Sequence, residues 1–459
     1  MSKAQNPETI TAMASLTELP NELVLDIISQ LEYDRPTLVS FAKTSRHFYD
    51  MTQSFVFRHV ELSNDKSIPN QLLRGKAMLL DRSFSTNPDL LKNVWSCDRV
   101  VDETGRGHMN RKEEWEFLEL ERFERYPNLK EAIFYYQFVR RRTLDLSLPT
   151  STYVFDSATT QRLKSIKLVT PHRSGINACI RLQNLRTLIL QDCDPRQLNV
   201  EGSSSSVRQL HILTTENFNS QYFNGETAIR PGAIGKLLIS FPALRQLCIR
   251  ASLGIWLYLG NQGDPGFLEV DVAEVTKALG FISANVEVLE LVCPLQGETM
   301  ETFNHPLQLQ SFPKIRRLTI SAICVFKITQ PYSRRENVLP TFLPPGLEDL
   351  HIVFPREIGV FYDYKEWLKG VRQTFPLDVD RYRWILQIPA LKKGACPRLR
   401  KVCLSEDEFS YVGAIQDGHD PCGGIQIWEP ADEVRSAYAH AEIKLDIKLC
   451  MGHYENQSL

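Results

Sequence analysis

A short apolar pattern recurs along most of this 459-residue chain and constrains its fold more than any other feature of the sequence. Nine times, apolar residues stand at positions i, i+3 and i+5, and the residue after the first of them is charged in all nine copies. Charged residues make up only 24% of the chain, so nine out of nine is far from what chance produces. The copies are Leu129/Ala132/Phe134, Leu163/Ile166/Leu168, Leu185/Leu188/Leu190, Val207/Leu210/Ile212, Leu244/Leu247/Ile249, Val286/Leu289/Leu291, Ile315/Leu318/Ile320, Leu347/Leu350/Ile352 and Leu399/Val402/Leu404. The charged residues are Lys130, Lys164, Arg186, Arg208, Arg245, Glu287, Arg316, Glu348 and Arg400.

The spacing within each copy is typical of a β-strand. Side chains of a strand alternate between its two faces, so positions i+3 and i+5 point to one face and positions i+2, i+4 and i+6 to the other. Between the copies, segments such as 234–241, which follows Pro231, and 272–282 have helical spacing. The sequence therefore predicts an α/β fold in which short buried strands alternate with helices.

This pattern resembles the LxxLxL core of leucine-rich repeats, in which each repeat contributes one strand to a curved parallel sheet. Successive copies start 22 to 52 residues apart, whereas regular repeats are 20–29 residues long, so we expect an irregular leucine-rich-repeat-like solenoid over residues 129–404. Phe57/Val60/Leu62 is a further copy before the first. The alternative is an α/β domain whose strands match the repeat pattern by coincidence.

In a solenoid of this kind, a partner protein would bind the concave face, to which positions i+2, i+4 and i+6 point. Arg250 and Arg317 are the best individual candidates, because arginine is enriched at binding hot spots. The predicted target-binding residues are Lys167, Thr187, Gln209, His211, Gln246, Arg250, Glu290, Arg317, Asp349, His351 and Lys401.

The N-terminal segment predicts three short helices within residues 15–62. Leu19, Leu23, Ile27 and Leu31 stand four apart, which places them on one side of the first helix. An aspartate followed closely by Pro36 starts a second helix, and a serine cap starts a third. A unit of this size without disulfides or metal is usually marginal, so we expect it to dock on another surface.

The order and spacing of these residues resemble the F-box. The match comprises Leu19-Pro20-x-Glu22-Leu23, Ile27-Ile28-x-x-Leu31, Leu38 and Lys43-Thr44-Ser45-Arg46-x-Phe48. In that family the helices dock on the small adaptor subunit of SCF-type, cullin-based ubiquitin ligases, and the rest of the chain selects the target. The resemblance implies that the adaptor-binding residues or their immediate support are Leu19, Pro20, Leu23, Ile27, Ile28, Leu31 and Leu38. The alternative is a helix trio buried against the remainder of its own chain.

The other segments complete the expected domain organisation. Residues 1–14 are expected to be disordered, residues 63–128 to form a linker or irregular first repeat with a charged helix over 111–126, and residues 354–396 to include helical pieces around Trp367 and Trp384. Residues 203–206 are predicted to form a flexible loop tip. In the C-terminal segment, 405–459, an acidic loop over 405–424 precedes a final capping strand containing Ile443, Leu445 and Ile447.

Composition argues against several classes of partner. With 53 basic and 55 acidic residues the formal net charge is −2, so no global field favours nucleic acid or an anionic membrane. There is neither an apolar signal core nor a run of about 18 apolar residues, so we expect an intracellular protein, cytoplasmic or nuclear. The ten scattered cysteines are expected to be reduced and mostly buried.

The sequence contains none of the common catalytic motifs. Gly-rich phosphate loops, a GxSxG elbow and an HExxH pair are all absent, so we expect a non-catalytic protein without cofactor or metal. A zinc clamp of His419, Cys422, Cys450 and His453 is a weaker alternative, based on two-residue gaps alone. Residues 140–142 are three consecutive arginines, which we interpret as a solvated loop rather than a nucleic-acid patch.

These observations predict an F-box protein of the fungal type, with a leucine-rich-repeat-like domain, that serves as the substrate-recognition subunit of an SCF-type ubiquitin ligase. It would promote transfer by proximity rather than by its own chemistry. Two alternatives remain: a non-ligase scaffold that uses the F-box for a stable adaptor complex, and an enzyme whose site lies in the irregular insertions. The identity of the target protein is beyond the sequence.

Overall fold

The computed structural model spans residues 1–459 and divides by its internal contacts into two compact units, residues 1–99 with 107–131 and residues 100–106 with 132–459. The predicted 15–62 segment and most of 63–128 thus belong to the first unit. The structure describes residues 19–31, 34–60, 79–80, 82–101, 125–136, 160–171, 173–193, 195–198, 205–214, 231–251, 255–256, 267–292, 300–303, 307–326, 335, 339–355, 358–363, 366, 369–375, 377–406, 425–450 and 454–455.

Three helices open the first unit, as the sequence predicts: α1 (Asn21–Gln30), α2 (Arg35–Ala42) and α3 (Arg46–Val56). Side-chain caps start the second and third, because Asp34 accepts from the Thr37 N–H and Ser45 from the Phe48 N–H. The helices share a small core of Val24, Ile28, Leu38 and Phe48, with Leu19, Leu31, Phe41, Met51, Phe55 and Val56 packed around it.

The remainder of the first unit surrounds Trp95. A short strand, β1 (His59–Val60), pairs in parallel with β2 (Ser96–Val101), which follows the 3₁₀ helix η2 (Pro88–Asn93). The Arg58 guanidinium and the Lys130 ammonium each lie 3.6 Å from the centre of the Trp95 ring. Cation–π contacts of this kind attach the strand region to the helices of the same unit.

The second unit is built on parallel strands, and nine of the strands begin at position i+2 of a copy of the apolar pattern. The α/β class is confirmed: the molecule has a large, mostly parallel open sheet of 13 strands, with β16 antiparallel to β17 at one end. Two strands of this sheet are β1 and β2, and the order of the others is β3-β4-β5-β6-β7-β10-β12-β13-β15-β17-β16. Their bounds are β3 Glu131–Tyr136, β4 Ser165–Val169, β5 Thr187–Gln191, β6 Gln209–Leu213, β7 Gln246–Arg250, β10 Val288–Val292, β12 Arg317–Ser321, β13 Asp349–Phe354, β15 Lys401–Glu406, β16 Ile425–Ile427 and β17 Lys444–Cys450.

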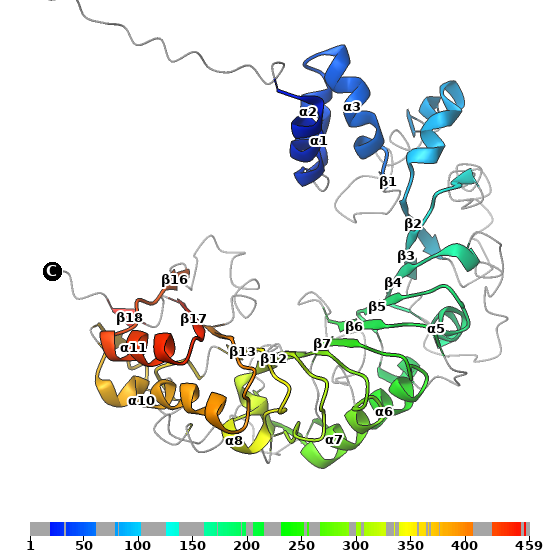
Figure 1. Ribbon diagram of the computed structural model, residues 1–459. Coiled ribbons are helices and arrows are strands. Elements are labelled where there is room, and N and C mark those ends of the chain that lie inside the picture. Colours follow the sequence, from blue (N-terminus) through cyan, green and yellow to red (C-terminus); the bar gives the residue numbers. More distant parts are fainter. Residues whose placement is uncertain are drawn as a thin grey trace, which may run out of the picture. The chain divides into compact units, whose positions relative to one another are not determined.

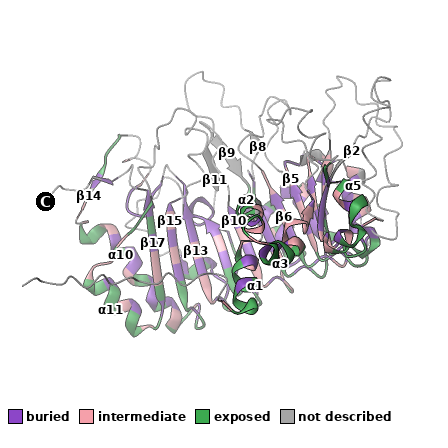
Figure 2. Ribbon diagram, turned by 90° about the horizontal axis from the view of Figure 1, so that it is seen from above, coloured by how far each residue is buried: buried purple, intermediate pink, exposed green. Residues whose placement is uncertain are grey.

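The apolar triplets form the core of this sheet. Equivalent positions pair directly across the strands, so Leu188, Leu210 and Leu247 form one continuous row and Leu190, Ile212 and Ile249 the next. All 27 side chains of the nine triplets are buried, with at most 4% exposed. The alternation of buried and more exposed residues along the strands is visible in Figure 2.

Helices lie on the outer side of the curved sheet in the second unit (Figure 1). The segments predicted to be helical at 234–241 and 272–282 form α6 and α7, and Trp384 lies in α10. The helices are α5 Arg173–Ile180, α6 Pro231–Ile239, α7 Val272–Gly280, α8 Leu339–Phe342, α10 Val379–Gln387 and α11 Asp432–His440, with 3₁₀ helices η7 Thr160–Arg162, η8 Pro195–Leu198, η10 Ala322–Cys324 and η12 Ile388–Lys393. Two small sheets, β11-β9-β8 and β14-β18, complete the unit, with β8 Ile255–Trp256, β9 Phe267–Val270, β11 Met300–Phe303, β14 Gln373–Thr374 and β18 Tyr454–Glu455.

Three expectations for loops and edges need correction. The loop predicted to start at residue 405 starts later, because β15 continues to Glu406. The predicted capping strand is β17, but it extends the parallel sheet, and the short antiparallel β16 forms the edge. In the predicted loop tip, Ser205 is buried and bonded to the Ser240 carbonyl, while the Ser206 hydroxyl donates to the Leu185 carbonyl at 2.8 Å.

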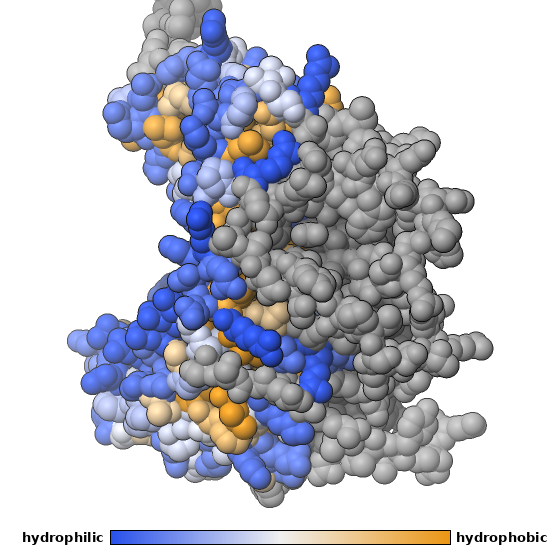
Figure 3. Space-filling model, turned by 90° about the vertical axis from the view of Figure 1, so that its right-hand side faces the viewer, coloured by the Kyte–Doolittle hydropathy of each residue, from blue (hydrophilic) through white to orange (hydrophobic). Residues whose placement is uncertain are grey.

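Several other predicted segments lie outside the described residues: 1–14, Leu62, most of the charged helix 111–126, Trp367 and the arginines at 140–142. The described part of the chain contains eight cysteines, and seven of them are buried, as expected. None of the helices in the described part of the chain has the length and apolar character needed to cross a bilayer. Hydrophilic side chains predominate on the described surface drawn in Figure 3.

Candidate functional site

The strand face opposite the buried triplets carries the predicted target-binding residues in ordered rows. Because the strands are paired without slippage, positions i+2, i+4 and i+6 each form one row across the sheet. The first row is Ser165, Thr187, Gln209, Gln246, Val288, Arg317, Asp349, Lys401 and Lys444. The second row is Lys167, Ile189, His211, Cys248, Glu290, Thr319, His351, Cys403 and Asp446.

The centre of this face is a cluster of polar side chains on β6, β7 and β10. Arg250 in the third row forms an ion pair with Glu290 in the second. His211 and Cys248 occupy the neighbouring second-row positions. Burial lowers the pKa of His211 and raises the pKa of the Cys248 thiol to about 12, with the Glu290 carboxylate adding to the second effect. At neutral pH the cluster therefore presents an uncharged imidazole and a protonated thiol beside one compensated ion pair.

A second polar group lies on β13, β15 and β17. The His351 Nε2 atom lies 2.7 Å from the Ser405 hydroxyl oxygen. The Asp446 carboxylate forms ion pairs with the ammonium groups of Lys444, at 3.3 Å, and Lys401, at 3.6 Å. Burial, with a smaller contribution from the Lys448 ammonium, lowers the pKa of His351 to about 4. The imidazole is thus neutral at pH 7, and both acidic and basic groups act on it.

The structure distributes the predicted target-binding residues over the whole sheet rather than gathering them at one point. Gln209, Arg250, Arg317 and Lys401 are exposed, and the others are half-buried. Some neighbours on adjacent strands touch: the Thr187 hydroxyl donates to the Gln209 amide oxygen at 3.0 Å. Cys248, at an equivalent face position, is buried instead, so the centre of the face is less accessible than the pattern implies. The arrangement is typical of a broad contact surface.

The predicted adaptor-binding residues divide into two groups. Leu23 and Ile27 expose 52% and 38% of their surface on α1, and Pro20 is also exposed. Ile28 and Leu38 are completely buried in the shared core of the three helices, and Leu19 and Leu31 pack against that core. Ile28 and Leu38 therefore cannot contact a partner through their side chains and instead support the exposed row.

A buried polar cluster at the end of β15 was not among the predicted sites. The Glu406 carboxylate accepts hydrogen bonds from the Val360 N–H at 3.0 Å, the Cys450 N–H at 2.8 Å and the Tyr454 hydroxyl at 2.6 Å. Burial raises the pKa of Glu406 to about 7, although these donors and Arg335 act in the opposite direction. The sequence contained one signal for the burial of Glu406. It stands two residues after Leu404, the last inward position of its copy, and strand alternation therefore points it inward too.

Arg335 is the second charged member of this cluster and is 1% exposed. Its guanidinium donates to the carbonyls of Gly359, Val360 and Tyr362 at 2.9 to 3.2 Å and lies beside the rings of Phe326, Phe354 and Trp384. Burial lowers its pKa to about 10. The cluster links the segment 358–363 to strands β15, β17 and β18, so its role is structural.

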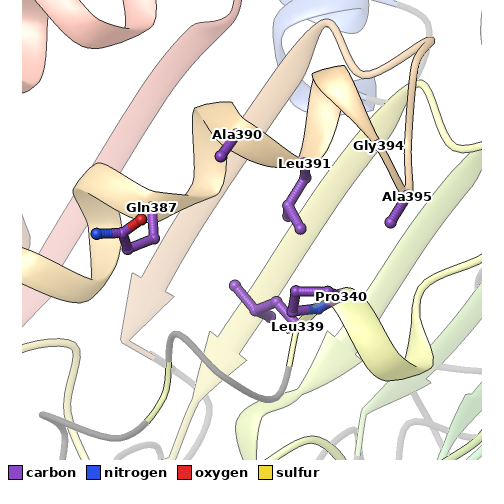
Figure 4. Close-up of a pocket in the computed structure, with 7 residues that line it drawn as sticks. All are labelled: Leu339, Pro340, Gln387, Ala390, Leu391, Gly394 and Ala395. Atoms are coloured by element: carbon purple, nitrogen blue, oxygen red, sulfur yellow. The ribbon is translucent and has the colours of Figure 1, made fainter.

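A surface cavity with a volume of about 370 Å³ lies between α8 and the α10–η12 region. Figure 4 shows its lining residues, which are Leu339, Pro340, Gln387, Ala390, Leu391, Gly394 and Ala395. These lining residues include no acidic, basic or nucleophilic side chain.

The zinc alternative lies largely outside the described part of the chain. Of its four residues only Cys450 is described, and it is buried. Among the described residues, no three histidine, cysteine, aspartate or glutamate side chains are grouped as a metal ion would require.

Comparisons with known proteins do not assign the chain to a family. No family model matches the sequence, and no curated protein matches it.

The pKa of His351 leads to a prediction for stability against pH. The unfolded chain takes up the imidazole proton near pH 6.5, but the folded protein does so only near pH 4, so stability falls as the pH falls through this window. We expect the loss to reach up to roughly 3 kcal/mol at pH 4, and to be absent from the variant His351→Gln. Urea unfolding at pH 7 and pH 4.5 measures it. The exposed His440→Gln is the control; if it matches His351→Gln in pH dependence, the assignment is wrong.

Proposed function

We propose that this protein is the substrate-recognition subunit of an SCF-type ubiquitin ligase. In this proposal the three N-terminal helices are an F-box that docks on the adaptor subunit, and through it on the cullin. The second unit is an irregular leucine-rich-repeat solenoid whose polar sheet face holds the target protein. The chain itself performs no chemistry, uses no cofactor, and acts by holding the target near the ubiquitin-charged enzyme.

The observation that carries the proposal is the apolar row left exposed on α1. Three helices with a core of four buried side chains make a small unit, which gains stability from an external partner. Leu23 and Ile27 stand four residues apart and remain exposed beside that core. They occupy two of the positions that the F-box resemblance assigns to the adaptor.

The sheet face supports the second half of the proposal. Its three rows contain both charge signs and several half-buried polar side chains, a composition closer to a protein-binding surface than to a substrate pocket. Arg250 and Arg317 are exposed there and remain the best candidates for residues that anchor the target, although Arg250 already forms an ion pair with Glu290. The identity of the target is open.

A complex with the purified adaptor tests the docking step. The full-length chain and the adaptor, each at about 10 µM, are expected to elute together as a one-to-one complex in size-exclusion chromatography with light scattering. Adding the cullin is expected to give a three-component complex. Failure of the adaptor to bind would contradict the F-box assignment. Binding of the adaptor without the cullin would favour the alternative, a scaffold that uses the helices outside a ligase.

A further inference from the structure

The charged residues of the last eight copies form a ladder along the edge where the strands begin, and each of these residues is one rung. Within the second unit, the backbone N–H of each rung donates to the carbonyl of the preceding rung, for example Arg186 to Lys164, Arg208 to Arg186 and Arg245 to Arg208, each at 2.8 Å. The rungs are thus neighbours about 4.8 Å apart. Because the main-chain groups are already paired, the backbone does not explain why these positions are charged.

The two halves of the ladder differ in sign pattern. In the later half, Glu287, Arg316, Glu348 and Arg400 alternate in sign, which is the arrangement that neighbouring charges favour. In the earlier half, Lys164, Arg186, Arg208 and Arg245 are all basic and all exposed. Exposed Arg162 stands two residues before the first of these rungs. We call these five residues the basic edge.

Few groups in the described part of the chain neutralise the basic edge. Among the residues that the structure describes, the side chains of Arg162, Lys164 and Arg208 have no hydrogen-bonding or ionic partner, and Arg186 donates only to the Ser206 carbonyl, at 3.3 Å. Arg245 alone meets a carboxylate, that of Glu287 at 3.5 Å, and there the alternating half begins. Like charges on adjacent rungs destabilise the sheet, so a purely structural ladder would continue the alternation. Binding of an anion would offset this repulsion between the basic side chains.

We propose that the basic edge binds an acidic segment of a partner polypeptide, on a surface separate from the sheet face. Arginine fits carboxylates with paired hydrogen bonds, and the four rungs span about 14 Å, the length of roughly five residues of extended chain. Single-stranded nucleic acid usually needs aromatic stacking, but the residues after the rungs are Ser165, Thr187, Gln209 and Gln246. The adjoining Glu287 would also repel a longer polyanion.

Fluorescence anisotropy with a labelled hexaglutamate peptide tests this proposal on the full-length chain at about 50 mM salt. We expect the double variant Arg186→Gln/Arg208→Gln to bind the peptide at least about tenfold more weakly than the unsubstituted protein. The matched control is Arg316→Gln/Arg400→Gln, which removes two arginines from the same ladder position in the alternating half and is expected to change affinity less than about twofold. Melting temperatures establish that all three proteins are folded.

Three results would overturn the proposal. The first is no binding of hexaglutamate to the unsubstituted protein, or binding equal to that of hexaglutamine. The second is an equal loss of affinity in the two double variants, because the effect would then come from net charge rather than from the basic edge. The third is tighter binding of a hexathymidylate oligonucleotide, lost in the same basic-edge variant, because the ligand would then be nucleic acid.

Discussion

Replacing Leu23 and Ile27 together by aspartate is expected to weaken binding of the adaptor subunit at least about a hundredfold. Each side chain lies on the exposed row of α1, and loss of a packed apolar contact at the centre of an interface costs about 2 kcal/mol or more. A carboxylate placed in an apolar interface adds a desolvation penalty. Biolayer interferometry with immobilised adaptor measures the change. Because neither side chain belongs to the core of the three helices, the variant is expected to fold.

Leu25 provides the matched control for this experiment. It lies on the same helix and exposes 41% of its surface, between the values for Leu23 and Ile27. At 100° per residue it projects about 200° away from both, and it is not one of the positions that the F-box resemblance assigns to the adaptor. Leu25→Asp is therefore expected to bind the adaptor within about threefold of the unsubstituted protein. Equal losses in both variants would refute the assignment of the docking side of α1.

Replacing Glu406 by alanine is expected to lower the free energy of unfolding by roughly 3 to 5 kcal/mol. The substitution leaves three buried donors, on Val360, Cys450 and Tyr454, without their acceptor. It also removes the carboxylate that favours the charged form of the buried Arg335. Urea unfolding followed by tryptophan fluorescence measures the loss, and the fluorescence of Trp384 reports on the region directly because its ring lies beside Arg335.

Two variants separate this effect from a general loss of charge. Glu406→Gln keeps one acceptor oxygen and is expected to lose less stability than Glu406→Ala. Since the pKa of Glu406 is raised to about 7, the native protein loses stability relative to the glutamine variant as the pH rises from 5 to 8. Glu274→Ala, an exposed position on α7, is expected to change stability by less than about 0.5 kcal/mol. An equal cost at Glu406 and Glu274 would show that the buried cluster contributes nothing.

The sequence predicted the strands well because their pattern is local. Period-two alternation within a copy fixes which side chains point inward, and this holds for Leu129 at one end and Leu404 at the other, both buried. The helices at 231–239 and 272–280 followed from apolar spacing and start signals for the same reason. The prediction was wrong where residues depend on distant partners. Ser205 is buried, and its N–H donates to the carbonyl of Ser240, which directly follows α6.

The candidate sites depended more strongly on tertiary packing. Leu23 and Ile28 look equivalent in a list of apolar residues, but one is exposed and the other is completely buried. The difference arises from where α2 and α3 pack on α1, which no periodicity encodes. Cys248 is similar, since its position predicts an accessible side chain but its neighbours bury it.

By itself the sequence determined that the chain forms parallel strands with helices between them, which residues fill the interior of the sheet, and that three short capped helices precede them, because these properties come from spacing along the backbone. Only the tertiary structure decided which apolar residues of α1 remain exposed, that Glu406 and Arg335 meet in the interior, and that four basic residues far apart in the sequence become adjacent rungs on one edge. These features require pairing between residues 20 or more positions apart, and their energies depend on burial and on neighbouring charges, which a linear pattern does not contain.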